Sequence, residues 1–152
     1  MKKIIITVGD ERGVGPEIVL KSLYSKQLPD DIEPIVVGSK KNIVSTYNSL
    51  RDQGITNLAN PNKLKIYDLE ITKKNTLNHK ANSGNASFFY LKKAIEIVKS
   101  LPDSALVTAP ICKKSWALAG HNYSGQTELL AETCNASKVG MLFTAKSPHT
   151  NW

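Results

Sequence analysis

The sequence predicts an α/β fold with three layers, in which a mainly parallel sheet lies between helices and leaves room for one antiparallel strand. Two observations lead to this prediction. Short apolar runs rich in β-branched residues recur along the chain, as in buried parallel strands, and segments with a helical spacing of apolar residues separate them. The chain of 152 residues can bury a core of its own, so we expect residues 1–152 to form a single α/β region.

The chain is expected to begin with a strand, a glycine-rich loop and a helix. Residues 4–8 form a β-branched run, and residues 9–15 then contain three glycines. Pro16 suits the first turn of a helix, and Glu17 complements the positive end of its dipole. The loop matches neither the dinucleotide-binding spacing G-x-G-x-x-G nor a Walker loop. Its glycines serve either a tight turn alone or a turn that also approaches a ligand, and both interpretations stay open.

The middle of the chain predicts two further strands with a helix between them. Residues 35–38 form the second buried strand, and Ser39 then caps a helix that ends at Gly54. Residues 64–69 alternate between apolar and polar side chains, which indicates an edge or half-exposed strand. Residues 73–80 are polar and are expected to form a loop.

A long helix is expected to follow the segment Ser83–Ser87 and to run through Leu101, until Pro102 stops it. Near the end of the chain, residues 139–144 form a further strand candidate. The apolar face of the long helix is expected to consist of Phe89, Ala94, Ile97, Val98 and Leu101.

The residues from 105 to 132 are the most informative part of the sequence. A short buried strand ends at Pro110, which cannot donate to a strand ladder, and Lys113 and Lys114 follow it. A further helix begins near Thr127, at a position suited to an N-cap. Anions and small ligands bind in α/β proteins where strands end and helices begin. An ordinary loop with solvated lysines is an equal alternative.

Three short segments of this stretch resemble the central signature of the 4-hydroxythreonine-4-phosphate dehydrogenase family: Val107–Lys113, Ala119-Gly120 and Gly125–Glu128. The loop at residues 9–17 is similar to the N-terminal signature of the family, although Glu11-Arg12 replace the usual Pro-Ala. The resemblance implies an architecture like that of isocitrate and isopropylmalate dehydrogenases. Family chains are about twice as long, so the resemblance also implies a truncated fold that corresponds to the N-terminal half.

The same resemblance implies three substrate-binding residues, Gln126, Thr127 and Lys113. Thr127 matches the His-Thr pair of the family, whereas Gln126 replaces its histidine. Glutamine donates and accepts hydrogen bonds but cannot act as an acid or a base near neutral pH. Lys113 matches a family lysine that can neutralise substrate, and an exposed structural lysine is the alternative. The resemblance assigns no catalytic or cofactor-binding residue in this chain.

The resemblance further implies NAD or NADP as hydride acceptor, and a divalent metal (Zn, Mg or Co) as Lewis acid. The metal-binding histidines of the family lie beyond the position of Trp152 and meet across a homodimer. His79, His121 and His149 have no metal-ligand spacing, and we give them no metal-binding role. The complete enzyme is expected to oxidise 4-phosphooxy-L-threonine in pyridoxal phosphate biosynthesis, and the isolated chain is expected to be inactive.

Composition narrows the classes of function and partner. The net charge is +7, but the lysines are dispersed and arginine is rare, which disfavours nucleic acid and suits a small anionic substrate. No apolar run has the length of a membrane span or a signal peptide, so we expect a cytoplasmic protein. Cys112 and Cys134 have no motif spacing, and Cys112 is interpreted as a small buried residue rather than a reactive thiol.

Two other classes of function are considered beside a dehydrogenase half. The first is a non-catalytic α/β fragment that binds anions. The second is an acyl or phosphoryl transferase, which is disfavoured because a Walker loop, a Gly-x-Ser-x-Gly elbow and a paired acid–base set are absent from the sequence. A truncated sheet is also expected to leave apolar surface bare, and so to pair with a partner or aggregate.

Overall fold

The sheet consists of four strands: β1 (Lys2–Thr7), β2 (Ile32–Gly38), β3 (Lys65–Asp68) and β4 (Ser104–Thr108). The structure is a computed structural model that describes residues 1–24, 28–72 and 78–144. In this part of the chain the strand order is β3-β2-β1-β4, and every neighbouring pair is parallel. The α/β prediction is therefore confirmed, and the described sheet contains no antiparallel strand.

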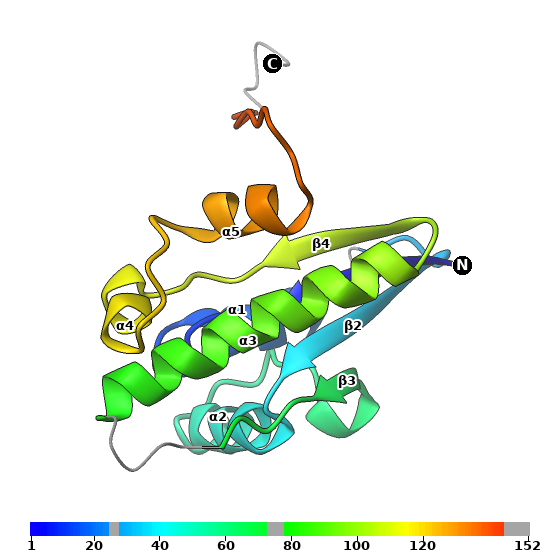
Figure 1. Cartoon of the computed structure of the whole chain (residues 1–152). Helices are drawn as coiled ribbons and strands as arrows, with labels where there is room; N and C mark the ends of the chain where they lie inside the picture. Colours follow the sequence, from blue (N-terminus) through cyan, green and yellow to red (C-terminus); the bar gives the residue numbers. More distant parts are fainter. Residues whose placement is uncertain (25–27, 73–77, 145–152) are drawn as a thin grey trace.

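Three helices follow the first three strands: α1 (Gly15–Tyr24), α2 (Lys40–Asp52) and α3 (His79–Ser100), with a 3-10 turn η1 (Pro61–Lys63) after α2. The chain moves outward from β1 to β3 and then returns to place β4 on the other side of β1. Right-handed crossovers in opposite directions put their helices on opposite faces of the sheet. Accordingly α1 and α2 pack against each other, whereas α3 crosses β1, β2 and β4 (Figure 1).

The main core fills the space between the sheet and these helices. Ile5 of β1, Val36 of β2, Leu20 of α1 and Ile43 of α2 are completely buried, and Ala94 is their counterpart on α3. Burying a side chain of the size of isoleucine or leucine contributes about 1.5–3 kcal/mol, so these residues hold the three layers together.

Two short helices extend the chain beyond β4: α4 (Lys113–Leu118) and α5 (Gln126–Thr133). They close a second apolar cluster against α3. The Trp116 indole N–H donates to the Ser87 hydroxyl over 2.8 Å, so this buried polar group is satisfied. The cluster consists of Phe88, Leu91, Ile95, Trp116 and Leu129.

Helix α3 begins earlier than the sequence predicts. Its N-cap is Asn78, whose side chain accepts from the Ala81 amide over 2.8 Å, so His79 is the exposed first residue of the helix rather than part of a loop. The segment Ser83–Ser87 lies inside the helix and is buried. Small polar residues have modest helix propensity, but here their size lets α4 approach closely. The rest of the expected loop, residues 73–77, lies outside the described residues.

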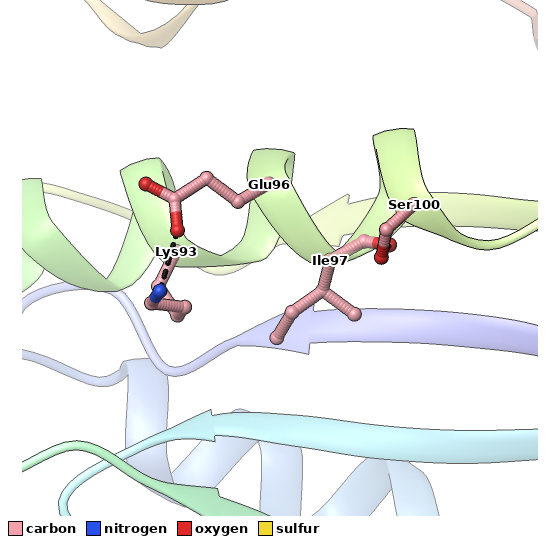
Figure 2. Close-up of polar contacts among 4 residues, drawn as sticks. All are labelled: Lys93, Glu96, Ile97 and Ser100. Atoms are coloured by element: carbon pink, nitrogen blue, oxygen red, sulfur yellow. Dashed lines mark hydrogen bonds and ion pairs between the residues drawn. The ribbon is translucent and has the colours of Figure 1, made fainter.

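The apolar face of α3 also differs from the prediction at one position. Phe88 is buried with 6% of its surface exposed, whereas the expected core residue Phe89 is 38% exposed. Figure 2 shows the last turns of the helix, where Ile97 points toward the sheet and the Lys93–Glu96 ion pair (2.5 Å) lies on the outside. The Ser100 hydroxyl donates to the Ile97 carbonyl over 2.8 Å, which satisfies an acceptor that the helix end leaves unpaired.

Other predicted features are found in place. The Ser39 side chain caps α2 by accepting from the Asn42 amide over 3.2 Å, and β3 is the predicted edge strand. The strand predicted over residues 139–144 is wrong, because this segment forms no regular structure. A strand needs a hydrogen-bonding neighbour, and none of the described strands pairs with it. In the described ranges, no helix has both the length and the apolar character to cross a membrane.

Candidate functional site

The candidate site lies at the carboxyl ends of β1 and β4, where the strand order reverses. In open α/β sheets this switch point leaves a crevice that ligands occupy. The loops after the two strands are joined there, because the Asp10 amide donates to the Pro110 carbonyl over 3.0 Å. Both loops then lead into helices, α1 and α4, at this edge of the sheet (Figure 1).

The glycines of the loop after β1 are required by the packing of the chain on itself. Gly9 has φ +66°, and a Cβ atom there would lie 2.2 Å from the Pro110 carbonyl oxygen. A Cβ atom at Gly15 would lie 2.0 Å from the Val8 carbonyl oxygen. Both distances are shorter than any real contact, so these two positions admit only glycine. The sequence left open whether these glycines allow a ligand to come close. In the structure they allow the loop to pack against neighbouring backbone.

Asp10 anchors this loop to helix α3. Its side chain is 7% exposed, and its Oδ1 atom accepts from the Arg12 amide over 2.9 Å and from the Ser83 hydroxyl. A buried carboxylate needs such donors to offset its lost hydration. The hydrogen bond between Ser83 and Asp10 therefore fixes the position of the loop at the switch point.

A second link between the loop and α3 joins Tyr90 to Glu11. The Tyr90 hydroxyl donates to the Glu11 carboxylate. Burial, together with the negative charge of Glu11, raises the pKa of Tyr90 far above its usual range. Tyr90 therefore stays protonated and acts as a hydrogen-bond donor rather than as a base.

The structure brings Lys113 and the start of α5 together. Lys113 is the exposed first residue of α4, and Gly125 is the N-cap of α5. A Cβ atom built on Gly125 would lie 3.5 Å from Lys113 Cε and 3.7 Å from its Nζ. A helix N-terminus carries partial positive charge, so it and the ammonium group together favour an anion. Glu128 Oε2 lies 3.3 Å from the same point and offsets part of this charge.

Gln126 lies between this helix start and the end of β4. Its Nε2 atom donates to the Ala109 carbonyl over 3.4 Å, which is a long hydrogen bond. Its Oε1 atom is buried and has no hydrogen-bond partner in the described structure. A buried unpaired acceptor costs about 1–3 kcal/mol, and a donor on a ligand would remove that cost.

Thr127 is the second residue of α5, and His121 lies in the segment between α4 and α5. Thr127 lines a separate groove of about 340 Å³, mostly apolar, that α5 forms with the segment after it. The His121 ring stacks on Phe88 with a centroid distance of 3.7 Å, and its Nε2 atom lies 2.9 Å from Asn85 Oδ1. His121 is therefore held in the aromatic packing between α3 and α4. Of the three predicted substrate residues, Lys113 lies beside Gly125, and Gln126 and Thr127 follow Gly125 directly in α5.

The structure corrects the interpretation of Cys112 as a small buried residue. Cys112 is half-buried at the N-cap of α4 rather than a fully buried residue. Hydrogen bonds from Ser115 lower the pKa of the Cys112 thiol. A lowered pKa increases the fraction of Cys112 that is thiolate, the reactive form, at neutral pH.

Sequence reasoning missed the part that α3 plays at the site. Ser83, Ser87 and Tyr90 follow each other at intervals of four and three residues, which places them on one helix face. This spacing could have indicated a polar helix face at the site. It was missed because the helix was expected to begin only after Ser87. Asp10 and Glu11 contact this helix face.

Comparison with known proteins decides the family. The model of the family described as pyridoxal phosphate biosynthetic protein PdxA matches residues 30–149, which is more than half of the chain. The chain belongs to the PdxA family. The relatives of this PdxA-family chain include a 4-hydroxythreonine-4-phosphate dehydrogenase of Synechococcus sp. (strain JA-3-3Ab), which is 39% identical over 156 residues. A relative in Oceanobacillus iheyensis, provisionally named D-threonate 4-phosphate dehydrogenase, is 34% identical over 152 residues.

Solved structures of PdxA-family proteins agree with this assignment. The crystal structure of a 4-hydroxythreonine-4-phosphate dehydrogenase from Burkholderia phymatum matches with a TM-score of 0.77 at 27% identity, over 97% of this chain and 47% of that one. This match confirms the expected isocitrate dehydrogenase-like α/β fold. The match to the Synechococcus relative covers 100% of this chain and 45% of the relative, and the match to the Oceanobacillus relative covers 92% and 46%. The chain thus spans about half the length of the curated relatives it matches.

The described residues of this PdxA-family chain do not by themselves fit the metal or the dinucleotide that the resemblance implies. In residues 1–24, 28–72 and 78–144, no three His, Cys, Asp or Glu side chains are grouped to hold a metal ion. The glycines that could open the loop after β1 to a pyrophosphate are closed against Pro110 and Val8 instead. What the site offers is a place for a small anion with hydrogen-bonding groups.

Proposed function

We propose that the chain is the substrate-binding half of a nicotinamide- and metal-dependent dehydrogenase that oxidises 4-phosphooxy-L-threonine in pyridoxal phosphate biosynthesis. The observation that carries the proposal is the grouping of Lys113, Gln126 and the start of α5 at the switch point of the sheet. The names of the Synechococcus relative and of the Burkholderia structure support the choice of reaction.

The proposed substrate matches these groups in its chemistry. Its phosphate and carboxylate are anions, which the Lys113 ammonium and the N-terminus of α5 attract. Its hydroxyl and ammonium groups are donors, and Gln126 Oε1 is a buried acceptor that lacks one. Thr127 is proposed as the third binding residue through its hydroxyl group. Gln126 binds and orients in this scheme, and proton transfer belongs to other groups.

We infer that residues 1–152 correspond to the N-terminal half of the enzyme and that the remaining half supplies the metal ligands and the nicotinamide site. The absence of a metal-binding group in the described residues supports this division, as does the 45% coverage of the Synechococcus relative. A homodimer in the cytoplasm is proposed as the complete form. On this basis the isolated chain binds substrate without turning it over.

The proposal is tested by calorimetric titration of the chain with 4-phosphooxy-L-threonine. Lys113→Ala is expected to weaken binding by about tenfold or more, because it removes a charge-assisted contact. The neighbouring exposed lysine provides the matched control, and Lys114→Ala is expected to change affinity by less than about twofold. Absence of binding, or equal effects of the two substitutions, would overturn the proposal.

A second titration, with D-threonate 4-phosphate, decides between two related substrates. The provisional name of the Oceanobacillus relative motivates this comparison. Both compounds carry the phosphate that Lys113 is proposed to bind, so Lys113→Ala weakens both. If D-threonate 4-phosphate binds more tightly, the proposed binding site stands, and D-threonate 4-phosphate replaces 4-phosphooxy-L-threonine as the proposed substrate.

A non-catalytic module that binds anions is the second candidate function. The observation that favours it is the same lack, in the described residues, of a metal-binding group and an open dinucleotide loop. Sequencing the coding DNA beyond the Trp152 codon separates the two candidates. An open frame of similar length that encodes well-separated histidines supports the dehydrogenase, and an immediate stop with no second half nearby supports the binding module.

A further inference from the structure

A polar cavity lies beside the loop after β1, between α2 and α3. Its volume is about 400 Å³, within the range of pockets that hold small metabolites. One wall is the first half of α2 and the opposite wall is the first half of α3, with the loops after β1 and β3 between them. Lys113, Gln126 and Thr127 do not line it, so it is distinct from the proposed substrate site.

The lining carries two charges of each sign. Arg12 and Lys41 are the cations, and Glu11 and Glu70 are the carboxylates. A lone anion in this cavity would be repelled by the two carboxylates. A lone cation would be repelled by the two positively charged side chains. A molecule with both charges can place each one beside its opposite, so the charge pattern selects a zwitterion.

Two of these charges are neighbours in the loop after β1. They belong to Glu11 and Arg12, which both line the cavity. Glu11 is held in place by the hydroxyl of Tyr90, which lies in the opposite wall of the cavity. The Tyr90–Glu11 hydrogen bond therefore fixes one of the four charges in the lining of the cavity.

The wall on α2 contains an unsatisfied acceptor as well. Asn42 lines the cavity, and its Oδ1 atom is buried with no hydrogen-bond partner in the described structure. The Asn42 backbone amide is already used in the Ser39 cap, so the side chain is not needed for the helix start. An ammonium or hydroxyl group on a bound molecule would supply the missing donor.

We propose that this cavity, which we call the α2–α3 pocket, binds a free amino acid as a zwitterion. The carboxylate of the amino acid lies toward Arg12 and Lys41, and its ammonium group lies toward Glu70 and Asn42. The pocket adjoins the loop that Asp10 and Glu11 anchor to α3, and that loop leads to the switch point. An amino acid bound there would stabilise the loop in the position that the structure shows.

The proposal is tested by ligand-observed NMR with the protein amino acids, each at about 5 mM, followed by calorimetry on those that bind. Acetate and ethylamine, which carry one charge each, are expected to bind at least about tenfold more weakly than the amino acid. Arg12→Ala and Glu70→Gln are each expected to weaken amino acid binding about tenfold. Both side chains are exposed, so neither substitution removes core packing.

Matched controls remove the same charges elsewhere. Arg51→Ala, at the last turn of α2, and Glu96→Gln, on the outer face of α3, are expected to leave the affinity within about twofold. Lys113→Ala is expected to weaken the binding of 4-phosphooxy-L-threonine by about tenfold or more and to leave amino acid binding within about twofold, so each proposal can fail without the other. The inference is overturned if no amino acid binds, if acetate binds equally well, or if Arg12→Ala and Glu70→Gln behave like their controls.

Discussion

The hydrogen bond from Tyr90 to Glu11 makes a testable contribution to stability. A hydrogen bond to a charged group contributes about 1.5–3 kcal/mol, and this one is made by a side chain that is 1% exposed. Tyr90→Phe keeps the ring and is therefore expected to lower the free energy of unfolding by about 1–2 kcal/mol in urea titrations at neutral pH. Tyr24→Phe, at a tyrosine that is 50% exposed, is the control and is expected to have little effect.

The same tyrosine predicts a dependence on pH. Its folded pKa is raised above the value of an unfolded chain, which is about 10. Above that pH the unfolded chain releases the Tyr90 proton while the folded chain retains it, so unfolding becomes more favourable as the pH rises. The Tyr90→Phe variant is expected to lose less stability than the wild type between pH 9 and pH 11, as about one proton fewer is released. Parallel curves for the two proteins would contradict this assignment.

Cys112 predicts a selective chemical reaction. Because hydrogen bonds from Ser115 lower the pKa of the Cys112 thiol, alkylation of Cys112 by iodoacetamide is expected to reach half its maximal rate at a lower pH in the folded chain than in the urea-unfolded chain. The rate is followed by mass spectrometry of peptides that contain Cys112. Ser115→Ala is expected to move this midpoint upward, and a midpoint that ignores the substitution would remove Ser115 as the cause.

At the scale of elements, the crossing of α3 and α4 depends on Gly84. Helix propensity alone predicts that Gly84→Ala stabilises α3 by about 1 kcal/mol. However, a Cβ atom there would lie 2.1 Å from the Ser115 carbonyl oxygen and 2.8 Å from the Trp116 amide nitrogen. The free energy lost when the two packed helices move apart exceeds the gain in helix propensity. We therefore expect a net decrease of about 2–3 kcal/mol in the free energy of unfolding.

Gly140 provides the control for this substitution. A Cβ atom at Gly140 has nothing within 4 Å. Gly140→Ala is therefore expected to change the free energy of unfolding by less than about 0.5 kcal/mol. If Gly84→Ala proves equally neutral in thermal and urea unfolding, the close contact of the two helices does not exist in solution.

The alternation of strands and helices could be predicted because it depends on local pattern. β-branched runs mark β1 and β2, and Ser39 marks the start of α2. The start of α3 could not be predicted so well, because small polar residues resemble a loop until the helix that packs on them is known. Residues 139–144 have strand composition but lack a partner, and pairing is not a local property.

The candidate site shows the same division between local and distant information. The signature residues pointed to Lys113 and Gln126, which lie in one continuous stretch of sequence. The contact of Tyr90 with Glu11 joins positions 79 residues apart, and the sequence near either residue does not predict the contact. Contacts of this kind are fixed by the crossover of α3 over the sheet, which only the structure supplies.

At the scale of the whole molecule, β4 leaves apolar surface uncovered. Among the described strands it pairs only with β1, and its Val107 side chain is 48% exposed. Met141, Leu142 and Phe143 are 66%, 87% and 84% exposed in the segment that follows α5. Exposed apolar side chains beside an open strand edge favour association.

We therefore expect the isolated chain to associate as its concentration rises, as measured by size-exclusion chromatography with light scattering. Val107→Lys is expected to shift the midpoint of association to at least about threefold higher concentration, because a lysine on an edge strand opposes pairing. Val14→Lys changes another exposed valine, 56% exposed in the loop before α1, and is expected to leave the midpoint unchanged. A wild-type chain that stays monomeric at all concentrations would contradict the expectation.

The strand order also has a consequence for how the chain folds during synthesis. β1 is made before β2 and β4, and Ile4 pairs with Pro34 of β2 on one side and with Ala105 of β4 on the other. At a translation rate of about 5–20 residues per second, β4 leaves the ribosome several seconds after β2. During that interval the first βαβ unit can form, but the second edge of the central strand stays open. The nascent chain thus carries an unpaired template at its centre, and we expect this interval to be when it depends most on chaperones.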